Sequence, residues 1–322
     1  MTDVPLDKPI KPTPVHARFW QALTQNPVVL KELRSRMRAG RAYLVITIYL
    51  ILMSILVGLV YLAFTTSSNA TGNSSQLQAV GKTIFGAVVG LELMMVCFLA
   101  PALTAGAIAS ERERQTFDLL RTTLLPARAF VLGKLASALS FLILLLVVGF
   151  PLLALASLFG GVSVGEALAA FLVLFVSALS FSAMGLVVSS LMQSTLAATV
   201  ISYVWAILMI FGEPTLIGFA VSFLSIASTG FGLNPTPGQM ALIEGMLYTI
   251  GYLLIALNPA AAVIASEVIL LDRQNLFYTT LPLSNGMVFP VISPWISYCA
   301  IYALFSALLI GLSVRFVRRV GK

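Results

Sequence analysis

The chain has 322 residues, of which 59% are hydrophobic and only 10% are charged. A soluble domain carries about 25% charged residues, so this composition excludes a soluble globular protein and predicts an all-α polytopic membrane protein. The net charge is +7, but 17 of the 19 lysines and arginines fall within residues 1–41, 110–134 and 315–322. This clustering indicates membrane topology rather than nucleic-acid binding, and the positive-inside rule puts all three blocks in the cytoplasm.

The N-terminal region divides into two parts. Four prolines predict a poorly ordered tail over residues 1–16. Residues 17–41 alternate apolar side chains with cations, which predicts an amphipathic helix lying in the headgroup plane against membrane lipid. The same pattern is also typical of a soluble helix that packs on a partner. Residues 42–322 form the membrane domain.

Six uncharged or nearly uncharged runs in that domain are each long enough to cross a bilayer as a helix. Between the fifth and sixth runs, residues 213–293 are apolar but broken by proline, glycine and acidic residues. This outer region forms either re-entrant or interfacial helices or a further pair of spans, and we favour six spans. The six predicted spans are 42–64, 80–109, 129–159, 164–191, 195–211 and 295–314.

The one strongly charged connection between spans is predicted to be a cytosolic helix over residues 110–124. Ser110 and Glu113 have the spacing of a capping box, and Arg114 and Asp118 have the spacing of an ion pair along a helix. An apolar stripe runs beside these charges. Such a helix either binds a partner or simply joins two spans at the membrane surface.

Inside the second span, Glu92 is a candidate for a functional role because a carboxyl group there is costly. It either is protonated, meets a polar group across a dimer, lines a pathway, or is satisfied by neighbouring Ser or Thr side chains or by nearby water. Gly86 and Gly90 precede it with the small-xxx-small spacing that lets two helices approach closely.

We expect no cofactor, metal or catalytic site in this chain. Gly81-Lys82-Thr83 imitates the end of a phosphate-binding loop, but Gln76 stands where that motif requires glycine. The single histidine, His16, lies in the tail, and the two cysteines fall inside apolar runs.

The segment SERERQTFDLLRTTLLPARAFVLGK, Ser110 to Lys134, resembles the stretch after the second span of ABC-2 type (type-2 ABC exporter) permeases. The helix that carries Asn26 to Arg34 is similar to the interfacial connecting helix of that family. The resemblance implies a six-span permease domain over 42–322 and a coupling helix at 110–124 that sits in a separate P-loop ATPase subunit. It implies transport rather than enzyme activity, with ATP and Mg bound by that partner.

The resemblance also implies a dimer with a second permease copy or a paralogue, in the cell (plasma/inner) membrane with both termini cytoplasmic. The alternatives are a secondary transporter or channel, or a non-transporting membrane anchor subunit of a larger complex. No sequence feature names the substrate. The resemblance assigns contact with the ATPase subunit to Glu111, Arg112, Glu113, Arg114, Thr116, Asp118, Leu119 and Leu120, with a second contact at Lys31 and Arg34.

Overall fold

The computed structural model describes residues 40–67, 74–115, 126–212, 215, 218–219, 222, 237–273, 277–282 and 288–319. Within these ranges, six helices are long and apolar enough to cross a membrane, which confirms the predicted all-α polytopic class. They are α3 (Gly40–Ser67), α4 (Ser74–Thr104), α7 (Ala127–Leu158), α8 (Val164–Leu191), α9 (Thr195–Ile207) with its π-helical continuation η1 (Leu208–Gly212), and α13 (Pro294–Arg319).

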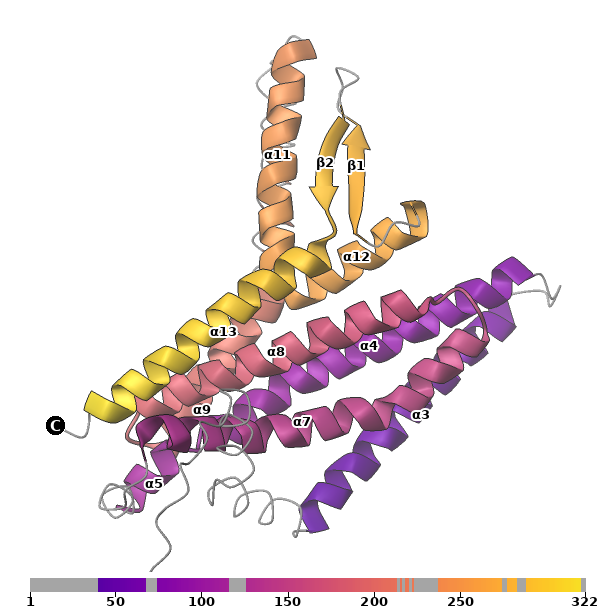
Figure 1. Ribbon diagram of the computed structural model, residues 1–322. Helices are drawn as coiled ribbons and strands as arrows, with labels where there is room; N and C mark the ends of the chain where they lie inside the picture. Colours follow the sequence, from indigo (N-terminus) through magenta and orange to yellow (C-terminus); the bar gives the residue numbers. More distant parts are fainter. Residues whose placement is uncertain are drawn as a thin grey trace, which may run out of the picture.

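These helices form a bundle with α8 at its centre (Figure 1). Long uncharged segments become helices in a membrane because every backbone N–H and C=O must find its partner within the segment. Helix α8 packs against α4, α7, α9 and α13, whereas α3 contacts α4 and α7 at one side. Most large apolar side chains of α3 are exposed, which is the surface that a helix presents to lipid.

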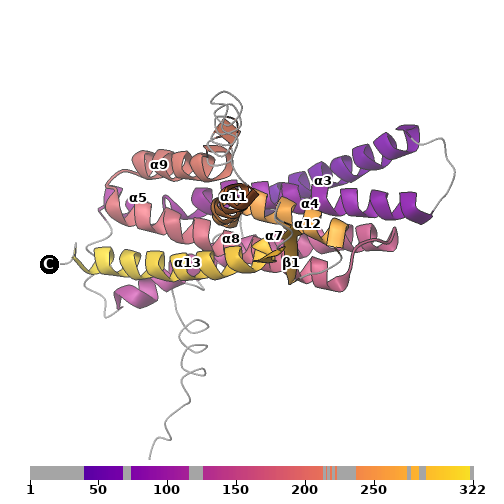
Figure 2. The same cartoon turned by 90° about the horizontal axis from the view of Figure 1, so that it is seen from above.

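Most of the described cations lie at one end of the bundle, which we call the basic end. It holds the short helix α5 (Ala109–Glu113), the first turn of α7 and the last turn of α13 (Figures 1 and 2). At the opposite end, α7 turns into α8 through Gly160 and Gly161, whose φ values of 83° and 88° favour glycine. Gly81 lies against the backbone of Gly160, so the neighbouring Lys82 belongs to that opposite end.

Small and hydroxyl side chains let α8 approach its neighbours closely. The hydroxyl groups of Ser177 and Tyr298 are 2.7 Å apart, and those of Ser180 and Ser306 are 2.6 Å apart, so two hydrogen bonds join α8 to α13. On another side of α8, a Cβ atom at Gly185 would collide with the Thr104 hydroxyl group of α4. Close contact of this kind replaces the hydrophobic driving force that is missing between helices in lipid.

The region before α13 contains helices α11 (Pro237–Leu257) and α12 (Pro259–Arg273) and an antiparallel hairpin of β1 (Tyr278–Pro282) and β2 (Val288–Ile292). The chain bends by 120° between α11 and α12, and as one bent pair they would give a seventh span. Helix α11 stands across the direction of the bundle in both views (Figures 1 and 2). The sequence led us to expect only helices here, so the hairpin is an addition to the predicted outer region.

Asn258, at the corner between α11 and α12, connects these two helices to the bundle through hydrogen bonds. Its side-chain amide donates to the carbonyl oxygens of Met209 (2.5 Å) and Ile210 (3.3 Å) in η1, and its Oδ1 accepts from the N–H of Ala261. The Tyr302 hydroxyl of α13 donates to the carbonyl oxygen of Leu257. These bonds satisfy carbonyl groups that the π-helix and the end of α11 leave free.

Candidate coupling site at the basic end

The chain leaves α4 through a turn at residues 105–108 and then forms α5, a helix of five residues. Gln115 follows with a left-handed φ of 57°, a conformation that ends a helix at its C-terminal side. The predicted helix over 110–124 is therefore wrong as one continuous element, because its described part stops at Glu113. Residues 116–125 lie outside the described residues.

The first turn of α5 is capped from another span. The predicted capping box between Ser110 and Glu113 does not form, since the N-cap of α5 is Ile108 and no side chain within the helix caps it. Instead, the Ser189 hydroxyl of α8 accepts hydrogen bonds from the N–H groups of Ile108 (2.9 Å) and Ala109 (3.0 Å). These N–H groups lie where a helix lacks its own acceptors, so Ser189 fixes the start of α5 on α8.

A partly buried ion pair joins α5 to α7. The Lys134 ammonium of α7 donates to Oε1 of Glu111 at 2.7 Å, and the two side chains are only 8% and 22% exposed. The same ammonium lies 5.6 Å from the centre of the Phe130 ring. The sequence did not predict this pair, because Lys134 was noted only as the last residue of the Ser110–Lys134 segment that resembles ABC-2 type permeases.

Two further contacts join α5 to the turn between α8 and α9. The Glu113 carboxylate accepts hydrogen bonds from the N–H (3.2 Å) and the hydroxyl group (2.7 Å) of Thr195. Thr195 is the first residue of α9, so the negative charge sits at the positive end of that helix dipole. The Arg112 guanidinium donates to the carbonyl oxygen of Met192, the C-cap residue of α8, at 3.4 Å.

The residues predicted to contact an ATPase subunit therefore fall into three groups. Glu111, Arg112 and Glu113 contact other helices of the same chain, whereas Arg114 is exposed. Glu111, Arg112 and Glu113 therefore attach α5 to neighbouring helices, a role that the sequence did not indicate. The remaining candidates lie outside the described residues: Thr116, Asp118, Leu119, Leu120, Lys31 and Arg34.

Glu92 lies inside the bundle, between α3, α4 and α7. Its side chain is 2% exposed, and Oε1 accepts a hydrogen bond from the Tyr49 hydroxyl of α3 at 2.9 Å. A Cβ atom at Gly149 of α7 would collide with the same Oε1, so glycine at that position makes room for the carboxyl group. The carboxyl group thus accepts a hydrogen bond from a tyrosine hydroxyl group of its own chain, whereas the sequence had suggested Ser or Thr neighbours or water.

Gly86 and Gly90 lie on a part of α4 that no other described helix covers. A Cβ atom built at either position meets no heavy atom within 4 Å. Within the part of the chain that the structure describes, these two glycines therefore mediate no close helix contact. Among the described residues there is also no group of three or more His, Cys, Asp or Glu side chains that could hold a metal ion.

The basic end thus presents a short helix directly after the second span, attached by side-chain contacts to the next three. Residues 24–217 match the family described as ABC-2 type transporter, a range that includes every helix from α3 to η1. No curated protein matches the chain. Because the family match covers more than half of the sequence, the chain belongs to the ABC-2 type transporter family and is the permease component of an ABC transporter.

Proposed function

We propose that this permease belongs to an ATP-driven exporter and that its basic end faces the cytoplasm, where a separate P-loop ATPase subunit binds α5 and the residues that follow it. The observation that carries this proposal is the attachment of α5 to three spans through Glu111, Glu113 and Ser189. A surface helix that only joined two spans would not require contacts with α7, α8 and α9 together.

The charge distribution supports the proposed orientation. Lys134 pairs with Glu111 of α5 near the start of α7, and the arginines of α13 lie in the last turns of that helix. Lys82, in contrast, belongs to the opposite end. Cations of multi-pass proteins concentrate on the cytoplasmic side, so we assign the basic end and both termini to the cytoplasm of the cell membrane.

In the proposed mechanism, ATP and Mg²⁺ are bound by the partner subunit, and this chain transmits the movement that results. Closure of two ATPase subunits displaces the segment after α5. Because α5 is short and fixed to α7, α8 and α9, it moves with these helices as one body and opens a path away from the cytoplasm. The uncovered face at Gly86 and Gly90 is our candidate for contact with a second permease copy or a paralogue.

Co-purification from native membranes in a mild detergent tests this proposal. We expect a P-loop ATPase to co-purify with the intact chain and to be lost from the double variant Glu113→Lys/Asp118→Lys. Glu113→Gln keeps a side-chain acceptor for Thr195, so this variant separates loss of partner binding from damage to α9. A matched control, Glu244→Lys/Asp272→Lys, reverses two acidic residues of α11 and α12 and should retain the ATPase.

Thermal unfolding of each purified variant shows whether it is folded. If no ATPase accompanies the folded intact chain, the proposed partner is wrong. If the control pair loses the ATPase as completely as the Glu113/Asp118 pair, the binding site is not at α5. If the ATPase binds and hydrolyses ATP but no transport of any compound is found, the chain acts as a membrane anchor rather than an exporter.

A further inference from the structure

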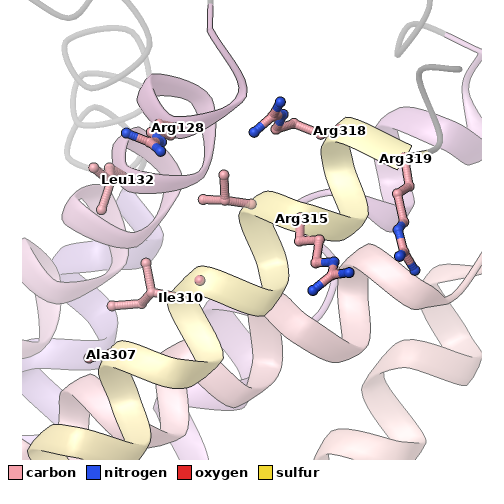
Figure 3. A pocket seen from close by; sticks show the side chains of 9 residues that line it. Arg128, Leu132, Ala307, Ile310, Arg315, Arg318 and Arg319 are labelled. Atoms are coloured by element: carbon pink, nitrogen blue, oxygen red, sulfur yellow. The ribbon is translucent and has the colours of Figure 1, made fainter.

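A cavity of about 760 Å³ opens between α7 and α13 at the basic end. Figure 3 shows Arg128 and Arg318 on facing helices, with Leu132 and Ile310 lying further along the same space. Arg315 and Arg319 extend from the last turns of α13. The full lining is Arg128 and Leu132 from α7 and Ala307, Ile310, Gly311, Val314, Arg315, Arg318 and Arg319 from α13.

The charge of this cavity is uncompensated within the described part of the chain. Neither α7 nor α13 contains an aspartate or glutamate anywhere in its length. The ion pair between Glu111 and Lys134 lies outside the cavity, because neither of these residues lines it. Arg128 and Arg318 therefore face the same space from two helices without a carboxylate beside them, and the exposed Arg315 and Arg319 add positive charge nearby, an arrangement that attracts an anion.

The wall of the cavity beside the arginines is apolar and contains unfilled space at Gly311. Leu132, Ile310 and Val314 contribute hydrocarbon side chains, and Gly311 contributes none. A Cβ atom at Gly311 would meet no heavy atom within 4 Å, so the surface is hollow at this point of α13. A cationic mouth that continues into an apolar wall suits a molecule with an anionic head and a hydrocarbon tail.

We propose that this cavity binds the phosphate group of an anionic phospholipid, with Arg128 and Arg318 holding the phosphate from two helices and one acyl chain lying along Gly311. Guanidinium groups match phosphate oxygens in a two-point geometry, which lysine does not reproduce. The site lies at the end of two spans, where lipid phosphates are concentrated. A bound lipid links α7 to α13 through its phosphate.

The apolar wall distinguishes a lipid from a soluble anion. Free phosphate would be held by the arginines alone and would gain nothing from Leu132 or the hollow at Gly311. This inference does not rest on the proposed ATPase contact, because none of the lining residues belongs to α5. The two proposals therefore succeed or fail separately.

The test is native mass spectrometry of the purified full-length chain, titrated with dioleoyl phosphatidylglycerol, dioleoyl phosphatidylcholine or inorganic phosphate. We expect preferential binding of phosphatidylglycerol and no displacement of it by inorganic phosphate. Arg128→Gln/Arg318→Gln should weaken this binding by roughly 30-fold, as expected when two cations near the membrane surface are removed. Gly311→Leu leaves the charge unchanged, fills the hollow, and should weaken binding of the lipid several-fold.

The control Lys82→Gln/Arg273→Gln removes the same charge away from the basic end and should bind phosphatidylglycerol like the unaltered chain. Equal loss in this control would show a general charge effect and overturn the site. Unchanged binding in Arg128→Gln/Arg318→Gln would overturn it as well. If inorganic phosphate displaces the lipid and Gly311→Leu has no effect, the cavity is a site for a free anion and the lipid assignment is wrong.

Discussion

The interior around α8 and the basic end around α5 are joined by different kinds of contact. In the interior, α8 meets its neighbours through uncharged hydrogen bonds, such as Ser177 with Tyr298, and through close approach at Gly185. At the basic end, the Glu111 and Glu113 carboxylates fix α5 together with the Ser189 hydroxyl group. Uncharged contacts depend on shape, whereas charged ones depend on ionic strength and respond to other charges nearby. The interior therefore sets the arrangement of the spans, and the basic end is the part suited to respond to a partner.

The largest expected effect is a loss of stability when a close contact in the interior around α8 is disrupted. Gly185→Leu forces a side chain into the space of the Thr104 hydroxyl group and should lower the free energy of unfolding by about 3 kcal/mol. Thermal unfolding in detergent measures the loss. Gly58→Leu in α3 is the matched control, since a Cβ atom there meets nothing within 4 Å. Equal stability of the two variants would show that α4 and α8 do not approach closely at Gly185.

An intermediate effect is expected for the ion pair at the basic end. Glu111→Lys or Lys134→Glu alone leaves two like charges in a largely buried place and should cost about 2 kcal/mol, a value reduced from that of a fully buried pair because Glu111 is partly exposed. The double charge swap should recover most of the loss. A double-mutant cycle on thermal unfolding measures the coupling. Additive losses in the swapped variant would contradict a direct pair.

The smallest effect should come from Glu113→Ala, which removes the acceptor for the first N–H of α9. We expect the midpoint of thermal unfolding to fall by about 2 °C, because the carboxylate is exposed and solvent screens it. The difference from the unaltered chain should shrink at high salt, whereas the effect of Gly185→Leu should not. Salt dependence of the same size in both variants would remove the distinction between the two regions.

The existence of the spans was predictable because it depends on composition over about 20 consecutive residues. The predicted span 164–191 has the same bounds as α8. The hairpin was not predictable in the same way, because β1 and β2 have only five residues each, β1 ends in Pro282 and β2 contains Pro290. Such segments have no periodicity that separates a strand from a piece of membrane helix.

The contacts of the candidate site were harder to predict than its position. The sequence pointed to residues 110–124 as a functional segment, but the spacing of Ser110 and Glu113 suggested a local partner. In the structure, Glu113 instead contacts Thr195, which is 82 residues away in sequence. Glu92 was recognisable as a buried acid, whereas its partner Tyr49 was one of several tyrosines in apolar runs. Partners brought together by tertiary packing leave no spacing signal in the sequence.

Helix α9 and its continuation η1 have a mechanical consequence for the whole molecule. Thr195 at one end receives the Glu113 carboxylate, and Met209 and Ile210 near the other end hold Asn258 at the corner of α11 and α12. Hydrogen bonds therefore hold both ends of this segment. Its first part is a regular α-helix and its last turn is a π-helix. We therefore expect a displacement of Thr195 along the helix axis to reach Asn258 and to shift the corner between α11 and α12.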